Sequence, residues 1–497
     1  MSGGEPVAGG SAGVAVMASP ITGRPAVVPA ADPSPRGKLV SLSLGDEPDA
    51  RIARSLAEME RLPYVEQVLA LPDVHQKAQM EIPSSIAVRT RDVIVPEFTS
   101  VAVNDGMGVV VTDLDAAGLT PERLQAFFTR VNMNSAGHPF DGNRYSISTD
   151  ELRRVIAEGG RGVLERYGFP EAMLGRFENR GVIAGAGDAR IEDVVPLHLL
   201  TTRFGRSEMG LNFGGNHFLE VQVVDRLLDR EAAAWGLREG QVVVMYHLGP
   251  GPFSGTLLHH YSRRTKLKPH RVPMFFVSKL LFHYVQRLGR THPARAWALH
   301  FRHNRWTPYP VDSDEGRTLR RALAMALNFG YAYRLATVRA IVDGLTEAVS
   351  PHVRADLLCD VSHNGITEET WGGQRGWIAR HNACRLTPGG PAIVAGSHDV
   401  ASYLGIGLDG GEDGRMHSYD HGAGNLIDHF RERGTLGSEP GSVLRVRMSR
   451  GKNAELKRRE QVPMRSAAPI ELVMECLERN RIVRPAVRLR PLGNFKN

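Results

Sequence analysis

The chain has few cysteines, no long apolar run and no internal repeat. Its three cysteines among 497 residues form neither a Cys-x-x-Cys pair nor a dense framework. This argues against a disulfide-rich secreted domain and favours a reducing, cytoplasmic compartment. No apolar run of about eighteen residues occurs, so we expect no membrane span. The first residues lack a basic start followed by an apolar core, so we expect no signal peptide.

Long blocks of lysine and arginine are also missing. The formal net charge is nevertheless +7 and the pI is about 9.4, which favours an anionic partner such as RNA, DNA or a nucleotide. The densest basic stretches are SRRTKLK at 262–268 and RGKNAELKRRE at 450–460. Each of them fits two interpretations, a phosphate-binding segment or a solvated face.

The composition of 42% hydrophobic and 23% charged residues is that of a globular protein. Residues 1–37 are rich in Gly, Ala, Pro and Ser and predict a flexible tail. No linker divides residues 38–497, where helical and strand patterns mix, so we predict a single large α+β domain. Helices are predicted at 47–62, 120–131 and 312–345. Strands are predicted at 99–104, 108–114, 217–225, 241–247, 355–363, 391–396 and 442–448.

Several predicted strands begin or end at a residue that can bind a metal. Asp105 follows one strand, His217 begins another, and His247 and His363 end two more. Active sites are often built where strand ends share a sheet edge. Three imidazoles and a carboxylate suit Mn²⁺, Zn²⁺ or Fe²⁺. The alternative for each histidine is a buried ring that bonds a backbone carbonyl.

The stretch YDHGAGN at 419–425 encloses His421 between an aspartate and small residues. One interpretation is a tight turn with an incidental histidine, since Gly, Asp and Asn favour turns. The other is that small neighbours let a large ligand, such as a nucleotide phosphate, approach the ring. Asp420 is accordingly either an acceptor that orients the His421 ring or a turn residue.

Ten stretches, taken in order, resemble the RtcB family of GTP-dependent RNA-splicing ligases. The resemblance runs from residue 71 to the C-terminal end, and its motifs are specific as a set rather than singly. The stretches are LPDVH (71–75), VNDG (103–106), GGNHFLEVQ (214–222), YHLG (246–249), VDSDEG (311–316), NFGYAYR (328–334), DVSHN (360–364), GGPAIVAGSHDVASYL (389–404), HGAG (421–424) and RLRPLGNFK (488–496).

This resemblance implies one domain with mixed and antiparallel sheets flanked by helices, and it assigns roles to residues. His421 matches the histidine that the family guanylates. The metal ligands fall on Asp105, His217, His247 and His363, with one or two Mn²⁺ ions expected and Zn²⁺ or Mg²⁺ as alternatives. Asp73 and His75 are expected to support them. GTP or GMP contacts are expected at Asn216, Glu220, Asn364, Gly396, Ser397, Ser402, Gly422, Ala423, Gly424 and Lys496.

Some positions depart from the family pattern. The family's Asp-x-x-Cys metal motif reads Ala102 and Asp105 here, which removes one ligand and replaces a thiolate by a harder carboxylate. The loop after His247 lacks the family's Ser and Arg, which hold phosphate. The family's Arg-Lys-Gly-Ala reads RHNA at 380–383, and its arginine after HGAG is Asn425. These changes predict a divergent member with an altered metal and RNA-phosphate apparatus.

The expected activity is that of a 3′-phosphate/5′-hydroxyl RNA ligase, which joins a 3′-phosphate or 2′,3′-cyclic phosphate to a 5′-hydroxyl through a GMP–histidine intermediate. The expected partners are RNA with such ends, in repair or tRNA splicing, and an archease-like activator. Two other functions stay open. One is a paralogue that binds RNA ends or GTP without sealing, and the other is a metal-dependent phosphoesterase, for which His421 and Lys496 would be unnecessary.

Overall fold

The computed structural model describes residues 37–44, 49–77, 80–135, 142–187, 190–210, 213, 215–262, 272–290, 292–301, 305–371, 373–409, 414–449 and 455–497. The predicted tail at 1–37 therefore lies outside the described residues, apart from Gly37. So do most of the basic stretch 262–268 and the first part of the stretch 450–460.

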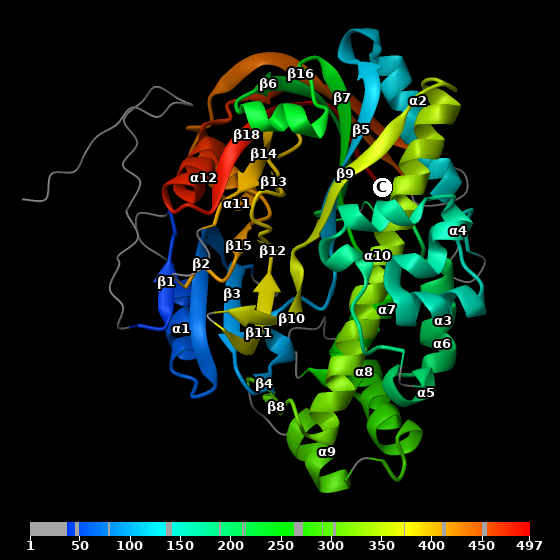
Figure 1. Ribbon diagram of the computed structural model, residues 1–497, viewed down its shortest axis with the longest axis vertical. Coiled ribbons are helices and arrows are strands. Elements are labelled where there is room, and N and C mark those ends of the chain that lie inside the picture. Colours follow the sequence, from blue (N-terminus) through cyan, green and yellow to red (C-terminus); the bar gives the residue numbers. More distant parts are fainter. Residues whose placement is uncertain are drawn as a thin grey trace, which may run out of the picture.

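The largest sheet has nine strands and arches over the upper half of the molecule (Figure 1). Its main path is β13 (Pro391–Val394), β14 (Ser402–Gly407), β18 (Val483–Lys496), β6 (Phe218–Leu227), β7 (Gln241–Leu248), β5 (Gly106–Asp115) and β9 (Ala355–Ser362). Off this path, β16 (Ser438–Met448) pairs with β18 and with β17 (Leu456–Arg465). All the pairs along the main path are antiparallel.

A second sheet of five strands and two small strand pairs complete the β structure. The five-stranded order is β1 (Leu39–Ser41), β2 (Val65–His75), β3 (Ser84–Thr90), β11 (Gln374–His381) and β10 (Asn364–Trp371). The small pairs are β12 (Ala383–Arg385) with β15 (Ser418–Asp420), and β4 (Val93–Ile94) with β8 (Tyr309–Pro310).

Helices cover these sheets, and the longest, α10, runs along most of the molecule (Figure 1). The α-helices are α1 (Ala50–Glu60), α2 (Pro121–Ser135), α3 (Thr149–Glu158), α4 (Leu164–Tyr167), α5 (Ile191–Val194), α6 (His198–Ser207), α7 (Pro252–Tyr261), α8 (Val272–Leu280), α9 (Pro293–His300), α10 (Asp314–Ala348), α11 (Gly424–Glu432) and α12 (Ala468–Arg479). Short 3-10 turns are η1 (Pro96–Phe98), η2 (Ala116–Gly118), η3 (Gly159–Val163), η4 (Glu171–Arg176), η5 (Glu178–Gly181) and η6 (Arg230–Trp235), and the π-helical turn η8 is Leu281–Gln286.

The predicted α+β class with mixed and antiparallel sheets is confirmed, and most predicted elements are found. Thr120 caps α2 as expected, since its Oγ1 accepts from the Arg123 N–H over 3.3 Å. The predicted strand at 99–104 is wrong, because these residues form turns and bends. Asp105 therefore precedes β5 instead of ending a strand. The polypeptide turns here because Asn104 adopts φ 63°, a left-handed conformation that ends extended structure.

Close packing of α10 explains its small residues. A Cβ added to Gly330 would lie 2.5 Å from the Cβ of Asn104, so only glycine lets the turn before β5 approach the helix. Two apolar cores result. One surrounds α10 and includes Leu319, Phe329 and Leu335; the other lies around β13, β14 and α12. Among the described residues, no helix is both long and apolar enough to span a bilayer.

Candidate active site

The four predicted metal ligands meet at one edge of the nine-stranded sheet. β6 and β5 begin where β7 and β9 end, because β6, β7, β5 and β9 are adjacent and antiparallel. His217 Nε2 lies 3.4 Å from Asp105 Oδ2, and His247 Nε2 lies 3.3 Å from His363 Nε2. The rings of His217 and His247, with centroids 5.4 Å apart, join the two pairs.

Burial keeps the imidazoles of His247 and His363 neutral. Loss of solvent lowers the pKa of His247 and of His363 well below the usual value, and the neighbouring histidines add to this effect. Neutral rings carry the nitrogen lone pair that a metal needs. Two buried atoms, Asp105 Oδ1 and His363 Nδ1, accept or donate no hydrogen bond among the described residues. Unpartnered buried polar atoms are costly, so both point to a missing ligand.

A buried ion pair supports this edge from behind. Arg334 on α10 and Asp360 on β9 are fully buried, and the Arg334 Nη2 lies 2.7 Å from Asp360 Oδ1. The Tyr246 hydroxyl donates to the same carboxylate over 2.7 Å. Arg334 also donates to the backbone carbonyl of Asn104, the residue before Asp105. The pair therefore fixes the turn that presents Asp105. Sequence reasoning quoted these residues within motifs but gave them no role.

His421 lies beside His247 and His363. Nitrogens of His247, His363 and His421 all lie within 4.8 Å of one another, and the His363 and His421 rings stack with centroids 4.8 Å apart. His421 Nδ1 lies 3.0 Å from the backbone oxygen of Asn382. A carbonyl only accepts, so Nδ1 carries the proton and Nε2 keeps its lone pair. Burial, followed by the charge of Lys77, lowers the pKa of His421 to about 3.

The acceptor for His421 is thus Asn382, not Asp420. Asp420 is fully buried on β15 and pairs across to Ala383, so the orienting role considered for it is wrong. Asn382 has φ 51°, which asparagine tolerates better than most residues. Its N–H donates to Asn364 Oδ1 over 3.0 Å. Asn364, predicted to contact nucleotide, therefore holds the loop that orients His421.

The small residues after His421 differ in how closely their surroundings pack against them. A Cβ on Gly422 would lie 2.7 Å from the Ala395 backbone oxygen, because backbone hydrogen bonds clamp this loop to Ala395 on both sides of Gly422. A Cβ on Gly424 would meet nothing within 4 Å. Gly422 is thus required by packing, while Gly424 leaves open space. Ala423 is buried and donates its N–H to the Ala395 carbonyl.

A cavity of about 530 Å³ adjoins His421. Its lining contains most of the predicted nucleotide contacts and both predicted supporting residues, and it adds Lys77, Arg431 and Asn494, which the sequence analysis missed. The predicted residues in the lining are Asp73, His75, Asn216, Glu220, His247, Gly396, Ser397, Ser402, His421, Gly422, Gly424 and Lys496. Asn364 and Ala423 do not line it, nor do Asp105, His217 and His363.

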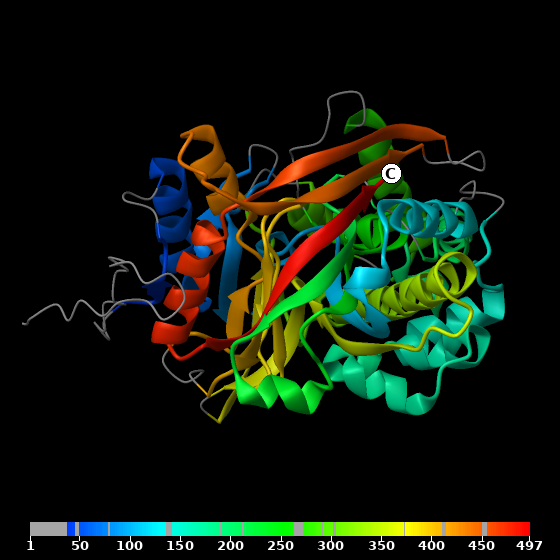
Figure 2. The same ribbon diagram turned by 90° about the horizontal axis from the view of Figure 1, so that it is seen from above.

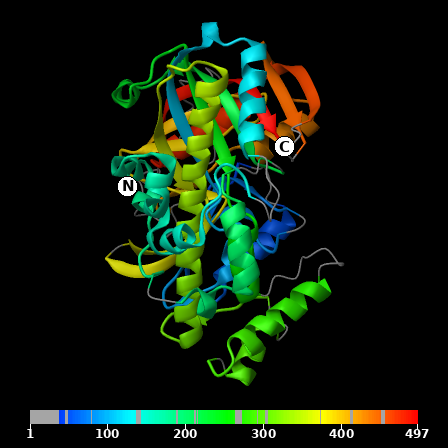
Figure 3. The ribbon, with the colours of Figure 1, turned by 90° about the vertical axis from the view of Figure 1, so that its right-hand side faces the viewer.

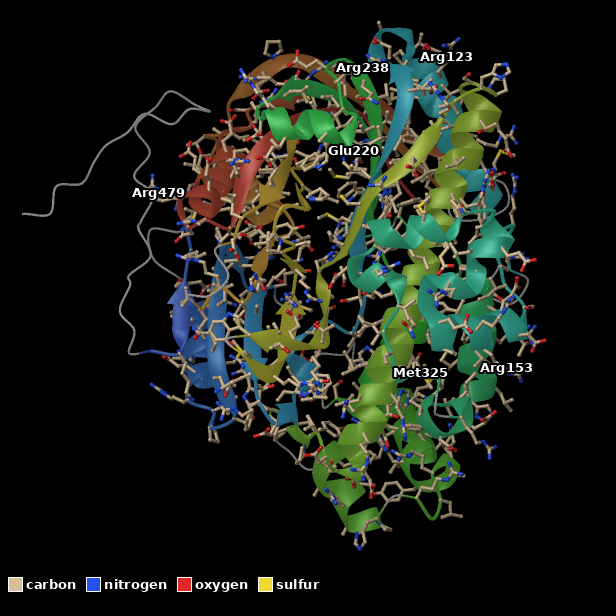
Figure 4. The ribbon with its side chains drawn as sticks, viewed as in Figure 1. Arg123, Arg153, Glu220, Arg238, Met325 and Arg479 are labelled. Carbon is tan, nitrogen blue, oxygen red and sulfur yellow. The ribbon has the colours of Figure 1, made fainter. Side chains whose placement is uncertain are left out.

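Glu220 anchors the floor of this cavity on β6 (Figure 4). Its Oε2 accepts from Asn494 Nδ2 over 2.9 Å and its Oε1 from Gln222 Nε2 over 2.5 Å. Gln222 also donates to Ser402 Oγ, which accepts from the Gly396 N–H over 3.0 Å. Burial raises the pKa of Glu220 to about 7. The hydrogen bonds that link Glu220, Gln222 and Ser402 thus hold the backbone of Gly396 in place. Gly396 is part of the cavity lining, so a ligand there would meet a rigid surface.

The mouth of the cavity carries several cations. Lys496 Nζ donates to the Gly215 carbonyl over 2.9 Å and, as an ammonium group, carries three protons that it can donate. Arg431 Nη2 lies 2.8 Å from Asp399 Oδ1, and Asp399 accepts from Ser397 Oγ over 2.7 Å. Lys77 and Lys496 both line the cavity, so an anion placed between their ammonium groups would be attracted at short range.

Asp73 and His75 line the cavity together with His247 and His421, and they also stabilise the loop that follows His421. Asp73 Oδ1 accepts from the Leu426 N–H over 2.8 Å, and Oδ2 from the Asn425 N–H over 3.3 Å. The carboxylate thereby caps α11, which follows His421. His75 Nδ1 donates to the Asp73 carbonyl over 2.7 Å.

Two of the departures noted in the sequence, at Ala102 and in the loop after His247, have structural counterparts. Ala102 offers only its backbone oxygen, which accepts from the Asp105 N–H over 3.2 Å. The loop after His247 leads into α7, where Glu208 accepts from the Gly251 and Phe253 N–H groups over 3.1 and 2.8 Å. A carboxylate thus holds the helix start, a position otherwise suited to a phosphate.

These residues fit a divalent cation. Asp105, His217, His247 and His363 supply one carboxylate and three imidazoles, and two of their buried atoms lack a partner among the described residues. Such mixed nitrogen and oxygen sets suit Mn²⁺ or Zn²⁺. Gly249 permits the arrangement, because a Cβ there would overlap Asp105 Oδ1.

Comparison with known proteins places the chain in a family. Residues 55–497 match the family model described as tRNA-splicing ligase RtcB. The tRNA-splicing ligase RtcB of Pyrobaculum aerophilum is 25% identical over 86% of this chain and 87% of its own length. The RNA-splicing ligases RtcB of Mycobacterium bovis and Mycobacterium tuberculosis are each 28% identical over 86% of this chain and 96% of theirs. The chain belongs to the RtcB family of RNA-splicing ligases.

Proposed function

We propose that this protein is a GTP-dependent RNA ligase that joins an RNA 3′-phosphate, or a 2′,3′-cyclic phosphate after opening, to a 5′-hydroxyl. The observation that carries the proposal is the hydrogen bond from His421 Nδ1 to the Asn382 carbonyl. It leaves the unprotonated Nε2 of a neutral ring beside a cation-lined cavity. Family membership supports the same reaction class.

In the first step, the Nε2 lone pair of His421 attacks the α-phosphorus of GTP. An N–P bond forms, the bond from that phosphorus to the bridging oxygen breaks, and pyrophosphate leaves with the electron pair. Asn382 holds the ring in place and accepts from Nδ1–H, which stabilises the positive charge that the ring gains. Lys77 and Lys496, which line the cavity, are placed to attract the phosphates.

A divalent cation would be held by Asp105, His217, His247 and His363. When bound, it would supply charge neutralisation for the phosphate oxygens. The residues themselves keep their lone pairs available, because burial keeps His247 and His363 neutral. The buried Arg334–Asp360 pair fixes the adjoining turn, so the carboxylate of Asp105 keeps its position.

Two further transfers complete the reaction. An oxygen of the RNA 3′-phosphate attacks the histidine-bound phosphorus, the N–P bond breaks and His421 is regenerated. The 5′-hydroxyl oxygen then attacks the RNA 3′-phosphate, loses its proton and displaces GMP. One difficult condensation is thereby divided into easier steps.

Intact-mass measurement after incubation with GTP and Mn²⁺ tests the proposal. We expect a gain of one GMP in the wild-type chain and none in His421→Ala, while His429→Ala, an exposed histidine on α11, should retain the gain. Adding RNA with a 3′-phosphate and a 5′-hydroxyl should discharge the GMP and give a sealed strand. RNA binding without GMP attachment would instead support a non-sealing paralogue, and phosphate release without attachment would support a phosphoesterase.

A further inference from the structure

A second cavity lies away from His421, between α10, the β10–β11 hairpin and η5. Its volume is about 490 Å³, and it shares no lining residue with the cavity beside His421. The C-terminal end of β18, which brings Lys496 to the catalytic cavity, and the β10–β11 hairpin lie on opposite sides of the molecule (Figures 2 and 3). Nothing in the ligation chemistry above uses this second cavity.

Four arginines line this second cavity. Arg317, Arg320 and Arg321 follow one another on α10 with spacings of three and one, so they share one side of the helix, and Arg385 ends β12. Arg317 pairs with Asp314, Arg320 lies 3.8 Å from Glu368, which also lines the cavity, and Arg385 Nε lies 3.5 Å from Glu369 Oε2. Arg321 forms no ion pair with any described residue. Arg321 lies one helical turn from Arg317 and next to Arg320, and a bound anion would balance its charge.

An aromatic and apolar wall faces the arginines. Trp377 on β11 is mostly buried, and the Arg320 guanidinium carbon lies 5.3 Å from the centroid of its ring. Leu323, Leu327 and Ile366 form the apolar part of the lining. Arginines beside a tryptophan and aliphatic side chains match a ligand with a phosphate at one end and a flat base at the other.

Part of the lining is ordered before any ligand binds. Arg385 Nη1 donates to Asn179 Oδ1 over 2.8 Å. Asn179 has φ 52° and donates through Nδ2 to the Tyr331 hydroxyl over 3.1 Å. A left-handed residue held from two sides costs free energy, and such residues concentrate at binding sites. A wall that is already ordered loses less entropy when a ligand binds.

We propose that this cavity, the arginine pocket lined by Arg317, Arg320, Arg321, Trp377 and Arg385, binds a nucleoside phosphate, either free or as one unit of an RNA strand. The phosphate contacts Arg320 and Arg321, and the base lies against the apolar wall next to Trp377. The volume of about 490 Å³ is within the range of small-ligand sites. This site is independent of GMP attachment to His421.

Binding is measured on the full chain carrying His421→Ala, so that no GMP becomes attached and a failure of the ligase proposal does not affect the result. The probes are ADP and an eight-residue oligoadenylate, titrated by calorimetry. Further chains add Arg320→Ala with Arg321→Ala, or Arg321→Glu alone. The matched control is Arg153→Ala with Arg154→Ala, which removes two exposed arginines from α3 (Figure 4). Circular dichroism checks that each variant is folded.

The expected result is saturable binding of ADP, oligoadenylate or both, weakened at least about tenfold by either pocket variant and unchanged by the control. Binding of ADP alone identifies a free nucleotide, and preference for oligoadenylate identifies an RNA strand. Equal affinity in the pocket variants and the control, or no binding of either probe, would overturn the proposal. If the double variant does not fold, Arg321→Glu decides, because Arg321 forms no ion pair with the described residues.

Discussion

The Nδ1–H of His421 donates to the backbone carbonyl of Asn382 over 3.0 Å, and Asn364 in turn accepts from the Asn382 N–H. The orientation of the proposed nucleophile therefore depends on a side chain outside its own cavity. Because a backbone carbonyl carries the contact, replacing the Asn382 side chain would not remove it, whereas replacing Asn364 weakens the loop that presents it.

Asn364→Ala is expected to slow GMP attachment about tenfold, since one buried hydrogen bond contributes roughly 1 to 3 kcal/mol when its partner stays unsatisfied. Asn364→Asp keeps an acceptor oxygen and should recover most of the rate. The rate is followed by intact mass after mixing with GTP and Mn²⁺. Equal rates for the alanine variant and the wild type would contradict the positioning role.

The two glycines beside His421 should respond differently to alanine. Gly422→Ala places a Cβ 2.7 Å from the Ala395 carbonyl, so we expect a loss of about 1 to 3 kcal/mol in stability. Gly424→Ala meets no atom within 4 Å and starts α11, so its stability should match the wild type or exceed it. It fills space in the cavity, however, and should reduce GMP attachment.

Thermal unfolding and intact mass, measured on both glycine variants, separate these effects. A stable Gly424→Ala chain with reduced attachment supports the access interpretation of the HGAG stretch. Full attachment in that variant would leave only the turn interpretation.

Restoring the family's metal motif by Ala102→Asp with Asp105→Cys should raise the Mn²⁺ retained per chain. The two positions adjoin, because the Asp105 N–H donates to the Ala102 carbonyl, and the added carboxylate and thiolate both bind metals. Asp105→Ala should lower retention and is the opposing control. Metal analysis and GMP attachment are measured together. We expect GMP attachment to rise with the metal content, and higher metal content with unchanged attachment would show that the ligand missing at Ala102 does not limit this step.

The Glu369–Arg380 pair predicts how stability depends on pH. Burial alone would raise the pKa of Glu369, but the charge and hydrogen bonds of Arg380 outweigh it and lower the pKa from 4.5 to about 2. A lowered folded-state pKa means that the stabilisation is complete above the unfolded pKa. It is lost as the pH falls from about 4.5 to about 2, and the shift corresponds to about 3 kcal/mol.

Urea unfolding at several pH values between about 6 and 3 tests this dependence. The stability gap between wild type and Glu369→Gln should shrink as the pH falls. Glu368→Gln, at the more exposed neighbouring position, should show no such change. If the difference in unfolding free energy between wild type and Glu369→Gln stayed constant with pH, the Glu369–Arg380 pair would not be the source of the pH dependence.

Local patterns in the sequence determined the element types and the chemistry-bearing residues. Thr120 and Pro121 mark the start of α2, and the β-branched runs predict β6, β7 and β9. The polar residues flanking those runs, His217, His247 and His363, are visible because the apolar runs begin or end there. Turns were predicted less well than helices and strands. The apolar run at 99–104 predicted a strand, but these residues form turns and bends, and Asn104 packs against Gly330.

Only the tertiary structure decided which residues meet. Strand adjacency in the order β6, β7, β5 and β9 depends on contacts between segments far apart in the chain, so no local pattern could place Asp105 beside His217. The same holds for Asn382 under His421, where a backbone carbonyl carries the contact and leaves no trace in residue type. The arginines of α10 were part of a helical prediction, and only the docking of Trp377 against them formed a pocket.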